Sequence, residues 1–262
     1  MVATLTRKAY LTPHYVRTWL QVPDIEPYRN ITVGVNNKIL VPPQGVEAIH
    51  FPSYDFAKHA WIHPPKEVAP SIRTYTHRGL EVERRELIVD FVAHGDEGPA
   101  SRWAINAEPG AQLGVLMKPD PKQLVPPAAW YLLAGDATAI PVLGAILEAL
   151  PATAKATVVI EVHGPEDEQV LQSAAQVDLR WLHNPDPQAG STLAEVVRGI
   201  ALPTEDRFAY VATEFSSVRA IRSYLRKEQG WSIDELYAFS YWKAGVAEDA
   251  SAADRQAEKH AV

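Results

Sequence analysis

The segment Arg73-Thr74-Tyr75-Thr76 is the sharpest local pattern of chemically active residues in the chain. On an extended strand, Arg73 and Tyr75 lie on the same face, because successive side chains alternate between faces. An arginine offers a rigid fork of donors for a phosphate, and a tyrosine offers a flat ring with a polar tip. The pattern indicates a ligand with a phosphate and a ring, although an ordinary exposed strand also carries such residues.

A second segment, residues 94–104, combines a glycine-rich turn with small residues at the expected start of a helix. Gly95, Gly98 and Pro99 predict a tight turn, and the backbone N–H groups after it would form an anion site. The hydroxyl of Ser101 adds a donor, so a diphosphate would fit. The alternative is a plain strand-to-helix turn. A Walker loop is excluded, because the Gly-Lys-Ser/Thr ending is absent.

Two further segments lie in the second half of the chain. In residues 134–141, a strand end, a glycine turn and a proline in the first helical turn predict a nucleotide site at the carboxyl edge of a sheet. The Gly-x-Gly-x-x-Gly fingerprint is absent, and a tight strand-to-helix turn is the alternative. After the last expected strand, Tyr241, Trp242 and Lys243 would cover a planar ligand or pack on the core.

Other polar groups form weaker patterns. His50, His59 and His63 share a loop-like stretch with Asp55, but their spacing is more typical of surface histidines than of metal ligands, and we predict no metal site. The chain has no Gly-x-Ser-x-Gly elbow, which argues against a serine hydrolase.

The composition narrows the classes of chemistry. The chain has 262 residues, 25 Lys+Arg, 32 Asp+Glu and no cysteine, with a formal net charge of −7. Without cysteine it holds no disulfide, cysteine nucleophile, zinc finger or cysteine-ligated iron–sulfur cluster. The acidic balance argues against nucleic acid as a partner, and no apolar stretch reaches the ~18–20 residues of a membrane helix. We expect a soluble cytoplasmic protein with neither a nucleic-acid nor a membrane partner.

The spacing of hydrophobic residues differs between the two halves of the chain. In the first half, residues 14–22 and 86–94 alternate with period two and prolines separate short strands, which predicts a small antiparallel barrel. The proline-rich residues 119–127 indicate a linker. The second half alternates strands and helices, which predicts parallel βαβ units. The expected strands are 129–134, 157–162, 177–182, 208–212 and 236–241, and the expected helices are 140–150, 166–175, 192–200 and 216–228.

In this order and spacing, the motifs resemble those of the siderophore-interacting protein family, which are FAD-dependent ferric-siderophore reductases of the ferredoxin-reductase-like superfamily. The motifs are Arg-x-Tyr-Thr, His-Gly-x-x-Gly-Pro-Ala-Ser-x-Trp-Ala, Gly-Asp-x-Thr-Ala-x-Pro and Tyr-Trp-Lys. Residues 37–42 also resemble the family's Lys-Leu-Leu-Phe-Pro stretch. The resemblance covers about residues 4–245. It implies an antiparallel six-stranded FAD-binding barrel (1–126), a parallel Rossmann-like α/β nicotinamide-binding domain (127–246) and a C-terminal tail or short helix (247–262).

The resemblance also implies which residues bind the cofactor. The expected FAD-binding residues are Arg73, Tyr75 and Thr76 for the flavin and its phosphates, Asp90, Val92 and His94 on the following strand, Ala100 and Ser101 for the diphosphate, Asp136, Thr138 and Ala139 at the domain junction, and Tyr241 and Trp242 closing the site. Electron transfer through a flavin needs no protein acid, base or nucleophile, so we expect no catalytic residue of that kind.

Ferric siderophores are often anionic, so the resemblance implies a basic substrate pocket. The candidates for binding the substrate are Lys38, Lys118, Lys122 and Lys243. Lys38 matches a basic position of the family's barrel, and Lys118 and Lys122 precede the linker. The alternative for each is a solvated surface charge.

By the resemblance the electron donor is NADH or NADPH, with a ferredoxin as the alternative. Thr213-Glu214 stands where the family commonly has Gly-Glu, so the nicotinamide-side loop differs. The acidic residues 166–168 follow a strand end where a 2′-phosphate would need Arg or Lys, which favours NADH.

We expect a monomer. Two other functions stay open: a general flavin reductase that releases reduced flavin, and a non-catalytic iron–siderophore binding protein.

Overall fold

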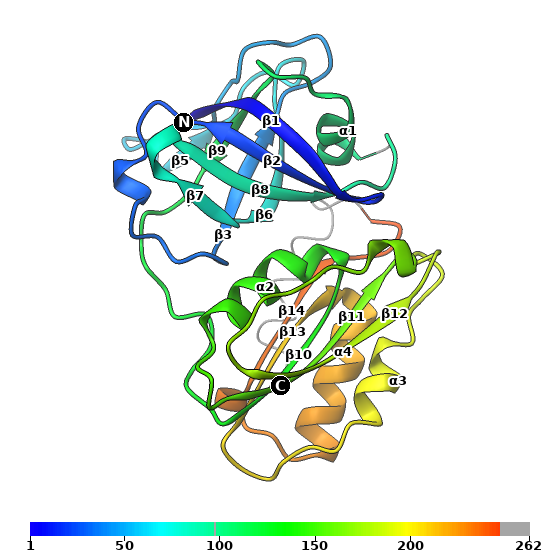
Figure 1. The fold of residues 1–262 in the computed structure, drawn as a ribbon. Coiled ribbons are helices and arrows are strands. Elements are labelled where there is room, and N and C mark those ends of the chain that lie inside the picture. Colours follow the sequence, from blue (N-terminus) through cyan, green and yellow to red (C-terminus); the bar gives the residue numbers. More distant parts are fainter. Residues whose placement is uncertain (97, 247–262) are drawn as a thin grey trace. The chain divides into compact units, whose positions relative to one another are not determined.

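The computed structural model describes residues 1–96 and 98–246. The chain forms two compact units, Met1–Lys122 and Gln123–Val262, called here the first and the second unit (Figure 1). The division falls within the proline-rich residues 119–127. The domain bounds at 126 and 127 stay a prediction, and the tail or short helix expected at 247–262 lies outside the described residues.

The first unit is a curled antiparallel sheet with strand order β6-β3-β9-β1-β2-β8-β7, which confirms the predicted barrel-like architecture (Figure 1). The resemblance implied six strands, and the sheet has seven, of which the edge strand β7 has three residues and pairs with β8 alone. The elements are β1 (Val2–Thr12), β2 (Tyr15–Gln21), β3 (Asn36–Val41), β4 (Ser53–Asp55), β5 (Ala60–Ile62), β6 (Ser71–Thr76), β7 (Gly79–Glu81), β8 (Glu86–Val92), α1 (Pro99–Asn106) and β9 (Gln112–Leu116).

The alternation predicted for residues 86–94 sets the core of this unit. Leu87, Val89 and Phe91 are fully buried and belong to one hydrophobic cluster, which α1 joins through Ala100 and Ala104. Fully burying a side chain of this size stabilises the fold by about 1.5–3 kcal/mol. The period-two pattern is therefore the physical reason why this segment is a strand with one face in the core.

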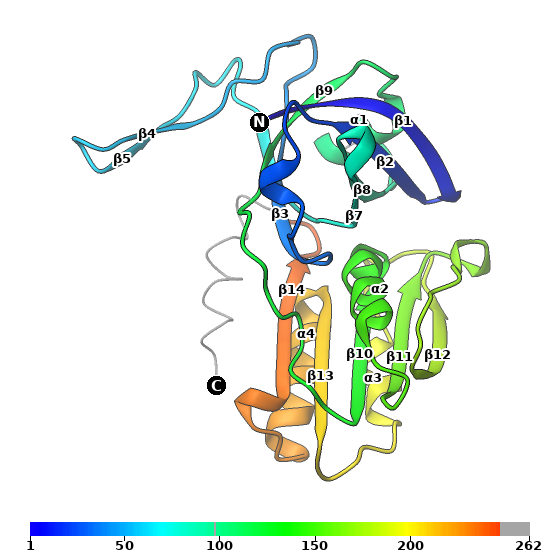
Figure 2. The same ribbon diagram turned by 60° about the vertical axis from the view of Figure 1, so that its left-hand side comes forward.

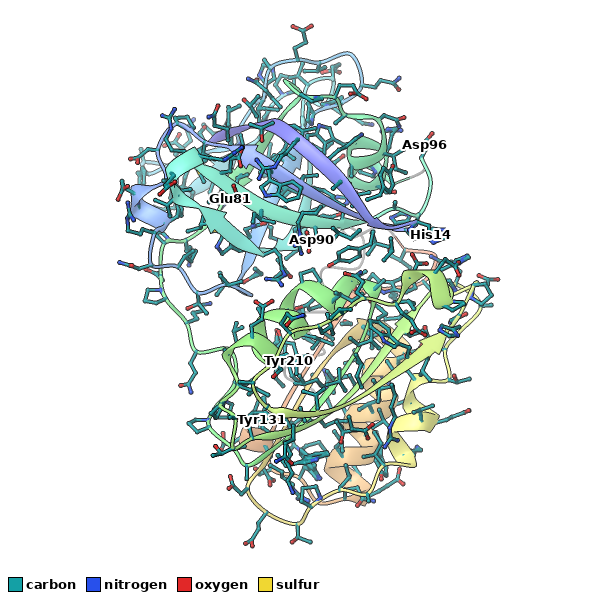
Figure 3. The ribbon with its side chains drawn as sticks, viewed as in Figure 1. His14, Glu81, Asp90, Asp96, Tyr131 and Tyr210 are labelled. Carbon is teal, nitrogen blue, oxygen red and sulfur yellow. The ribbon has the colours of Figure 1, made fainter. Side chains whose placement is uncertain are left out.

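The opposite face of β8 carries a buried ion pair. Arg17 on β2 lies opposite Asp90 in the strand register and donates hydrogen bonds of 2.7 and 2.8 Å to its two carboxylate oxygens. The Tyr15 hydroxyl donates a third, at 3.2 Å. Figure 3 labels Asp90 on its strand. Because Asp90 is buried, these partners compensate a charge that would otherwise be costly in the interior.

His77 follows β6 and is fully buried, and neither of its ring nitrogens has a hydrogen-bond partner. Burial lowers the pKa of His77 to about 4, and the positive charge of Arg78 acts in the same direction. An unfolded histidine titrates near pH 6.5, so between pH 6.5 and 4 the unfolded chain binds a proton that the folded chain does not. Stability therefore falls as the pH drops through this window.

We expect the variant His77→Leu to lose this contribution to the pH dependence. Between pH 6.5 and 4, the native chain should lose about 3 kcal/mol more of its free energy of unfolding than the variant does. Chemical denaturation at several pH values measures the slope, which does not depend on the absolute stability of the variant. The control His50→Leu replaces an exposed histidine and should keep the native slope. Equal slopes in native chain and His77→Leu would contradict the buried neutral histidine.

A two-stranded hairpin, β4–β5, extends from the first unit (Figure 2). Tyr54 packs edge-on against Phe56 and Trp61, with ring centroids 5.1 and 5.4 Å apart. His59 lies in its turn with a positive φ of 50°. Among the described residues, the histidines of this stretch do not gather with Asp55 into a set of metal ligands.

The second unit is a parallel sheet with strand order β12-β11-β10-β13-β14, which confirms the predicted α/β architecture (Figure 1). The order reverses between β10 and β13, and ligands of such sheets bind at the carboxyl ends of the strands around this point. The elements are β10 (Trp130–Asp136), α2 (Ile140–Ala149), β11 (Lys155–Val162), β12 (Gln176–His183), α3 (Leu193–Arg198), β13 (Arg207–Glu214), α4 (Phe215–Ser223) and β14 (Leu236–Trp242).

Helices cover both faces of this sheet. Leu132 and Ala134 of β10 share a buried cluster with residues of α3 and α4. The next residue, Gly135, faces the other side, where an added Cβ would lie 3.1 Å from Leu143 of α2 and 2.8 Å from the carbonyl oxygen of Ala212. A glycine at this position lets α2 approach the sheet closely. Among the described residues, no helix is both long enough and apolar enough to cross a membrane.

The helix predicted at residues 166–175 is wrong. Only Pro165–Asp167 form a 3-10 turn, and the chain then runs without regular structure to β12. The segment offers too few apolar residues to bury one face of a helix, and Val170 is 86% exposed. The other predicted strands and helices of this unit are present with small shifts in their ends.

Candidate functional site

In the first unit, α1 presents an N-terminus that no side chain of the described residues caps. The helix begins at Pro99, its N-cap residue is Gly98, and no side-chain oxygen in residues 1–96 or 98–246 accepts a hydrogen bond from the first turn. Backbone N–H groups at such an end attract anions. At the other end, Lys8 Nζ donates a 2.7 Å hydrogen bond to the carbonyl of Ile105, which anchors the helix to β1.

The Ser101 hydroxyl fixes the turn before this helix. It accepts a 3.0 Å hydrogen bond from the His94 backbone N–H and donates one of 2.7 Å to the Gly95 carbonyl. The hydroxyl proton is therefore committed, and an anion would contact Ser101 through its backbone N–H instead. The neighbouring Ala100 is buried, and His94 is exposed.

The ring of Phe91 contacts one aromatic ring from each of the first two sequence motifs. The rings of Tyr75 and Phe91 lie 4.5 Å apart, and those of Phe91 and Trp103 lie 5.8 Å apart. Tyr75 belongs to the Arg-x-Tyr-Thr strand and Trp103 to α1. Packing of this kind holds the strand and the helix N-terminus in one fixed arrangement.

Arg73 and Tyr75 share one face of β6, as predicted, and Lys38 lies on the other. Arg73 lies opposite the buried Ile39 of β3 in the register, whereas Lys38 lies opposite Thr74. The Lys38 ammonium donates a 2.5 Å hydrogen bond to Thr74 Oγ1. Lys38 thus lies on the opposite face of the β3–β6 pair from Arg73 and Tyr75.

The remaining candidate residues of the first unit lie at the ends of β6 and β8 and in the segment after β9. Val92 is half-buried at the end of β8, and Thr76 is buried at the end of β6. Lys118 follows β9 by two residues, and Leu116 of that strand is the register partner of Lys38. Lys122 is exposed, and its backbone N–H donates to Thr32 Oγ1 at 2.9 Å.

In the second unit, three buried carboxylates line the carboxyl edge of the sheet. Asp136 is at the end of β10, Glu161 near the end of β11 and Glu214 at the end of β13. Asp136 and Glu161 are register partners on adjacent strands. Each carboxylate is hydrogen-bonded by the chain itself, as a buried charge requires.

Asp136 ties together three segments at this edge. One of its oxygens accepts hydrogen bonds from the backbone N–H and the hydroxyl of Thr138, at 2.9 and 2.5 Å. The other accepts from Thr213 Oγ1 and Trp242 Nε1, both at 2.7 Å. Asp136 therefore caps the short helical turn over Ala137–Ala139 that precedes α2. The candidates Thr138 and Ala139 belong to this turn.

Glu214 caps α4 in the same way. One carboxylate oxygen accepts hydrogen bonds from the backbone N–H groups of Ser216, at 2.5 Å, and Ser217, at 3.4 Å. The Ser216 hydroxyl donates to the same oxygen. The other oxygen accepts from the Ala244 backbone N–H at 3.3 Å. The side chain of Glu214 thus occupies the N-terminus of α4.

Glu161 is held by the loop after β12. It accepts hydrogen bonds from Ser191 Oγ at 2.6 Å and from Asn184 Nδ2 at 3.0 Å. Burial raises the pKa of the Glu161 carboxyl, the hydrogen bonds from Ser191 and Asn184 oppose this, and the negative charge of Asp136 raises it further. A carboxylate with a raised pKa beside a cavity is a functional candidate.

A cavity of about 220 Å³ opens between these groups, within the second unit. Its wall joins the ends of β11, β13 and β14 to the loop before α3. The polar and aromatic residues that line it are Glu161, Gln188, Ser191, Glu214, Ser216 and Trp242. We call it the carboxyl-edge cavity.

The two aromatic residues predicted to close a flavin site have different surroundings. Trp242 lines the carboxyl-edge cavity with its ring nitrogen bound to Asp136. The hydroxyl of Tyr241 lies 3.4 Å from that of Tyr210, and burial raises the pKa of Tyr241. The Lys243 ammonium lies 4.8 Å from the centre of the Phe215 ring, a cation–π contact.

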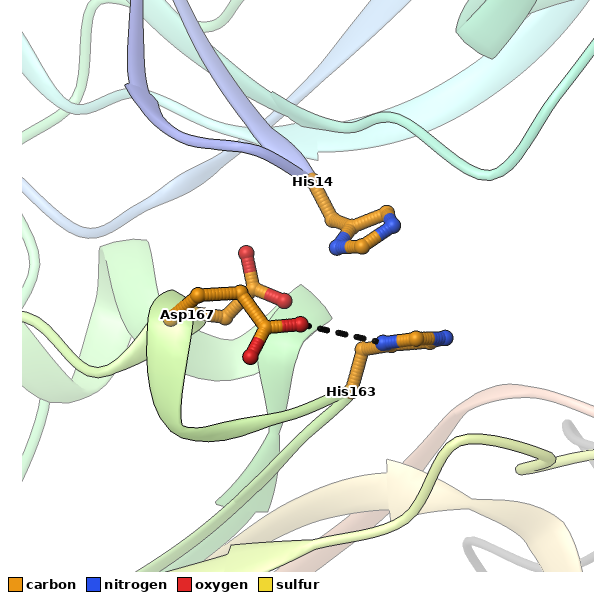
Figure 4. Close-up of side chains that lie close together, drawn as sticks. His14, His163 and Asp167 are labelled. Carbon is orange, nitrogen blue, oxygen red and sulfur yellow. Dashed lines mark ion pairs between the residues drawn. The ribbon is translucent and has the colours of Figure 1, made fainter.

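The acidic segment after β11 lies beside two histidines, which form ion pairs with it only when they are protonated. His163 Nδ1 lies 3.6 Å from a carboxylate oxygen of Glu166, as the dashed line in Figure 4 marks. A second histidine, His183, lies 2.9 Å from Glu168. The carboxylates here are partnered by histidines of the same unit, and no lysine or arginine occurs in the sequence between Lys155 and Arg180.

Sequence reasoning missed Glu161 and Ser191. A signal for Glu161 was present: it is the one charged residue in a run of apolar and β-branched residues, one position before the strand ends. A charge in such a run faces either solvent or a site. Ser191 carried no signal, because its place beside Glu161 depends on the path of the loop after β12.

Comparison with known proteins matches both units. Residues 4–122 match the family model of the siderophore-interacting FAD-binding domain, and residues 128–245 match that of siderophore-interacting protein. The ferric vibriobactin reductase ViuB of Vibrio cholerae serotype O1 is 35% identical over 246 residues, which cover 93% of this chain and 89% of that protein. The uncharacterized protein Rv2895c of Mycobacterium tuberculosis is 36% identical over 199 residues, which cover 71% and 69%.

Solved structures of siderophore-interacting proteins superpose on this chain. The siderophore-interacting protein SipS from Aeromonas hydrophila superposes with a TM-score of 0.83 at 29% identity, covering 100% of this chain and 98% of that one. A siderophore utilization protein from T. fusca superposes with a TM-score of 0.82 at 27% identity, covering 94% of each chain. Phthalate dioxygenase reductase shares the fold, with a TM-score of 0.58 at 15% identity over 92% of this chain and 67% of that one.

Proposed function

The chain belongs to the siderophore-interacting protein family, and from this premise we propose that it is an FAD-dependent reductase of ferric siderophores. It takes electrons from a reduced nicotinamide nucleotide and releases Fe(II) in the cytoplasm, acting as a monomer. The observation that carries the proposal is the uncapped N-terminus of α1, joined through Phe91 to the Arg73–Tyr75 strand, in the unit that matches an FAD-binding domain. The name of the Vibrio cholerae relative supports the reductase activity.

The residues of the first unit fit the chemistry of FAD. The N–H groups of Ala100 and Ser101 and the guanidinium of Arg73 would hold the diphosphate, because these donors suit an anion. Tyr75 would hold the flavin side with its ring, and His94 flanks the same turn. When bound, FAD supplies the ability to accept two electrons together and to pass them on one at a time.

The chain's own task is to bind, orient and exclude water. No side-chain acid or base is needed, because the iron substrate changes only its charge and the one proton left from the donated hydride can pass to water. Fe(II) is less charged and softer than Fe(III) and is held weakly by hard oxygen donors, so reduction frees the iron from its chelate. Arg17 and Tyr15 hold Asp90 by hydrogen bonds, which supports a structural role for it in β8 in place of the expected contact with the cofactor.

The donor is NADH rather than NADPH in this proposal. Residues 1–122 carry 14 Lys+Arg against 13 Asp+Glu, whereas residues 123–262 carry 11 against 19. The loops after β11 and β12 contain no lysine or arginine to pair with a 2′-phosphate. A ferredoxin remains the alternative donor.

Lys38, Lys118, Lys122 and Lys243 are proposed to attract an anionic ferric siderophore. The variant Lys38→Glu should raise KM for an anionic ferric chelate more than for a neutral one, because the reversed charge acts only on the charged substrate. The variant Lys243→Glu should do the same. Steady-state kinetics with one chelate of each charge measures both values. The control Lys58→Glu, on the exposed hairpin, should leave KM for both chelates unchanged. Equal increases of KM for the anionic and the neutral chelate in Lys38→Glu and Lys243→Glu would contradict the basic-pocket proposal.

The function is tested by loading the full chain with FAD, desalting it and offering NADH with a ferric siderophore and a coloured Fe(II) trap. The proposal predicts trapped Fe(II) at a rate that depends on the chelate. A rate that is the same for every ferric chelate would favour a general flavin reductase. Chelate binding without flavin retention would favour the iron–siderophore binding protein.

A further inference from the structure

We propose that the carboxyl-edge cavity binds the nicotinamide–ribose half of the electron donor, and that the capping carboxylates of Asp136 and Glu214 keep the donor's phosphates from the helical turns after β10 and β13. This inference rests on the proposed function and deepens it. It predicts that phosphate groups add nothing to donor affinity, unlike in folds where helix N-termini bind the diphosphate.

Side chains of the protein itself occupy the positions beside this cavity where a parallel α/β sheet usually binds an anion. In a parallel α/β sheet, the first turns of the helices beside the point of strand reversal supply N–H groups to a diphosphate. Here the Asp136 carboxylate accepts from the N–H of Thr138, and the Glu214 carboxylate accepts from the N–H groups of Ser216 and Ser217. A phosphate would meet two negative charges in the place of free donors.

The uncapped N-terminus of α1 in the first unit provides an internal contrast. Its N-cap is Gly98, and among the residues that the structure describes no side chain accepts a hydrogen bond from its first turn. In the second unit, a carboxylate caps the helical turn that precedes α2 and another caps the first turn of α4, although α2 itself, like α1, has no side-chain cap. The lack of lysine and arginine between Arg180 and Arg198 extends the contrast to the loop beside the cavity.

The size and lining of the cavity also suit the nicotinamide–ribose half of the donor. Its volume of about 220 Å³ is below the ~300–1,000 Å³ of sites for drug-sized ligands, so it suits one ring with a sugar rather than a dinucleotide. Carboxylates such as Glu161 accept hydrogen bonds from ribose hydroxyls and from a carboxamide N–H. Trp242 adds a planar wall. The oxidised nicotinamide ring is a cation, which Glu161 and Glu214 would stabilise by their charge.

The kinetic test compares donors that differ in their phosphates. The FAD-loaded full chain is assayed with dihydronicotinamide riboside, reduced nicotinamide mononucleotide, NADH and NADPH, with ferricyanide as the acceptor. We expect kcat/KM for the riboside to lie within about threefold of that for NADH, and NADPH to be the poorest donor. A value for NADH about tenfold or more above the riboside would overturn the proposal, because a built diphosphate site contributes at least that much.

A matched pair of variants locates the site. Glu161→Gln should raise KM for the riboside and for NADH by the same factor, about three- to tenfold, since it weakens an acceptor used by both. Glu195→Gln replaces an exposed glutamate of α3 and should leave both values unchanged. Unchanged KM values in Glu161→Gln would overturn the assignment of the cavity.

A binding measurement provides a readout without turnover. Calorimetry with nicotinamide riboside and with ADP-ribose separates the two halves of the donor on the same protein. We expect heat from the riboside and none from ADP-ribose, and the reverse result would overturn the proposal. A parallel assay with a ferric siderophore keeps the two claims apart: if ferricyanide is reduced and the siderophore is not, the proposed function fails while the donor site stands.

Discussion

Replacing Asp90 by alanine is expected to lower the free energy of unfolding of the first unit by about 3 kcal/mol, near the lower end for a broken buried ion pair. The Arg17 guanidinium would lose both of its carboxylate hydrogen bonds, and the Tyr15 hydroxyl would lose a third. We place the value at the lower end because the Arg17 side chain is 24% exposed and regains some hydration. Chemical denaturation measures the change.

This prediction separates a structural role of Asp90 from the cofactor-binding role that the family resemblance implies. The folded Asp90→Ala protein should bind FAD with an affinity close to that of the native chain. The double variant Arg17→Leu/Asp90→Leu should recover most of the lost stability, because it removes both charges and replaces them with apolar groups. A stable Asp90→Ala protein with weak FAD binding would reverse the assignment.

Replacing Arg73 by glutamine is expected to raise Kd for FAD about ten- to hundredfold. A hydrogen bond to a charged group contributes about 1.5–3 kcal/mol, and each 1.4 kcal/mol is a factor of ten in affinity. Arg73 is half-buried on β6, two residues from Tyr75, which packs on Phe91. Titration of the apoprotein with FAD, followed by flavin fluorescence, measures Kd.

The control for this prediction is Arg29→Gln. Arg29 is exposed and forms an ion pair of 2.7 Å with Glu26 in its own helical turn, so its loss should not affect FAD. Thermal unfolding of both variants without FAD shows whether the effect is on binding or on the fold. An Arg73→Gln protein that binds FAD as tightly as the native chain would remove Arg73 from the phosphate site.

The sequence predicted the elements whose pattern is local and strong. Residues 86–94 alternate so regularly that both the strand and its buried face follow from them, as the burial of Leu87, Val89 and Phe91 confirms. The apolar period of residues 140–150 likewise predicts α2. The helix expected at 166–175 failed, because its charges and its two large apolar residues, Val170 and Leu171, offer no face to bury.

The site is harder to predict, because it depends on contacts between distant residues. The family resemblance suggested a flavin role for Asp90, but the side chain that meets it is Arg17, 73 residues away along the chain. The same holds for Trp242, whose ring nitrogen binds Asp136. Such pairs depend on strand order and register, which no local motif contains.

The two capping carboxylates are a second example of contacts that sequence motifs do not predict. Asp136 and Glu214 stand where a motif search expects a nucleotide, at the ends of β10 and β13. Only the three-dimensional structure shows that their oxygens accept the N–H groups of the following helical turns. The sequence therefore indicates where a ligand would bind, and the hydrogen bonds indicate which part of that ligand the site would bind.

The most direct test of the central claim follows flavin and iron in one vessel. The FAD-loaded, desalted chain is reduced with one equivalent of NADH without oxygen and then mixed with a ferric siderophore and an Fe(II)-specific chelator. The account predicts that the oxidised flavin absorbance returns while the coloured Fe(II) complex forms, in proportion to the flavin present. Flavin that is lost on desalting, or reduced flavin that persists while no Fe(II) appears, would contradict it.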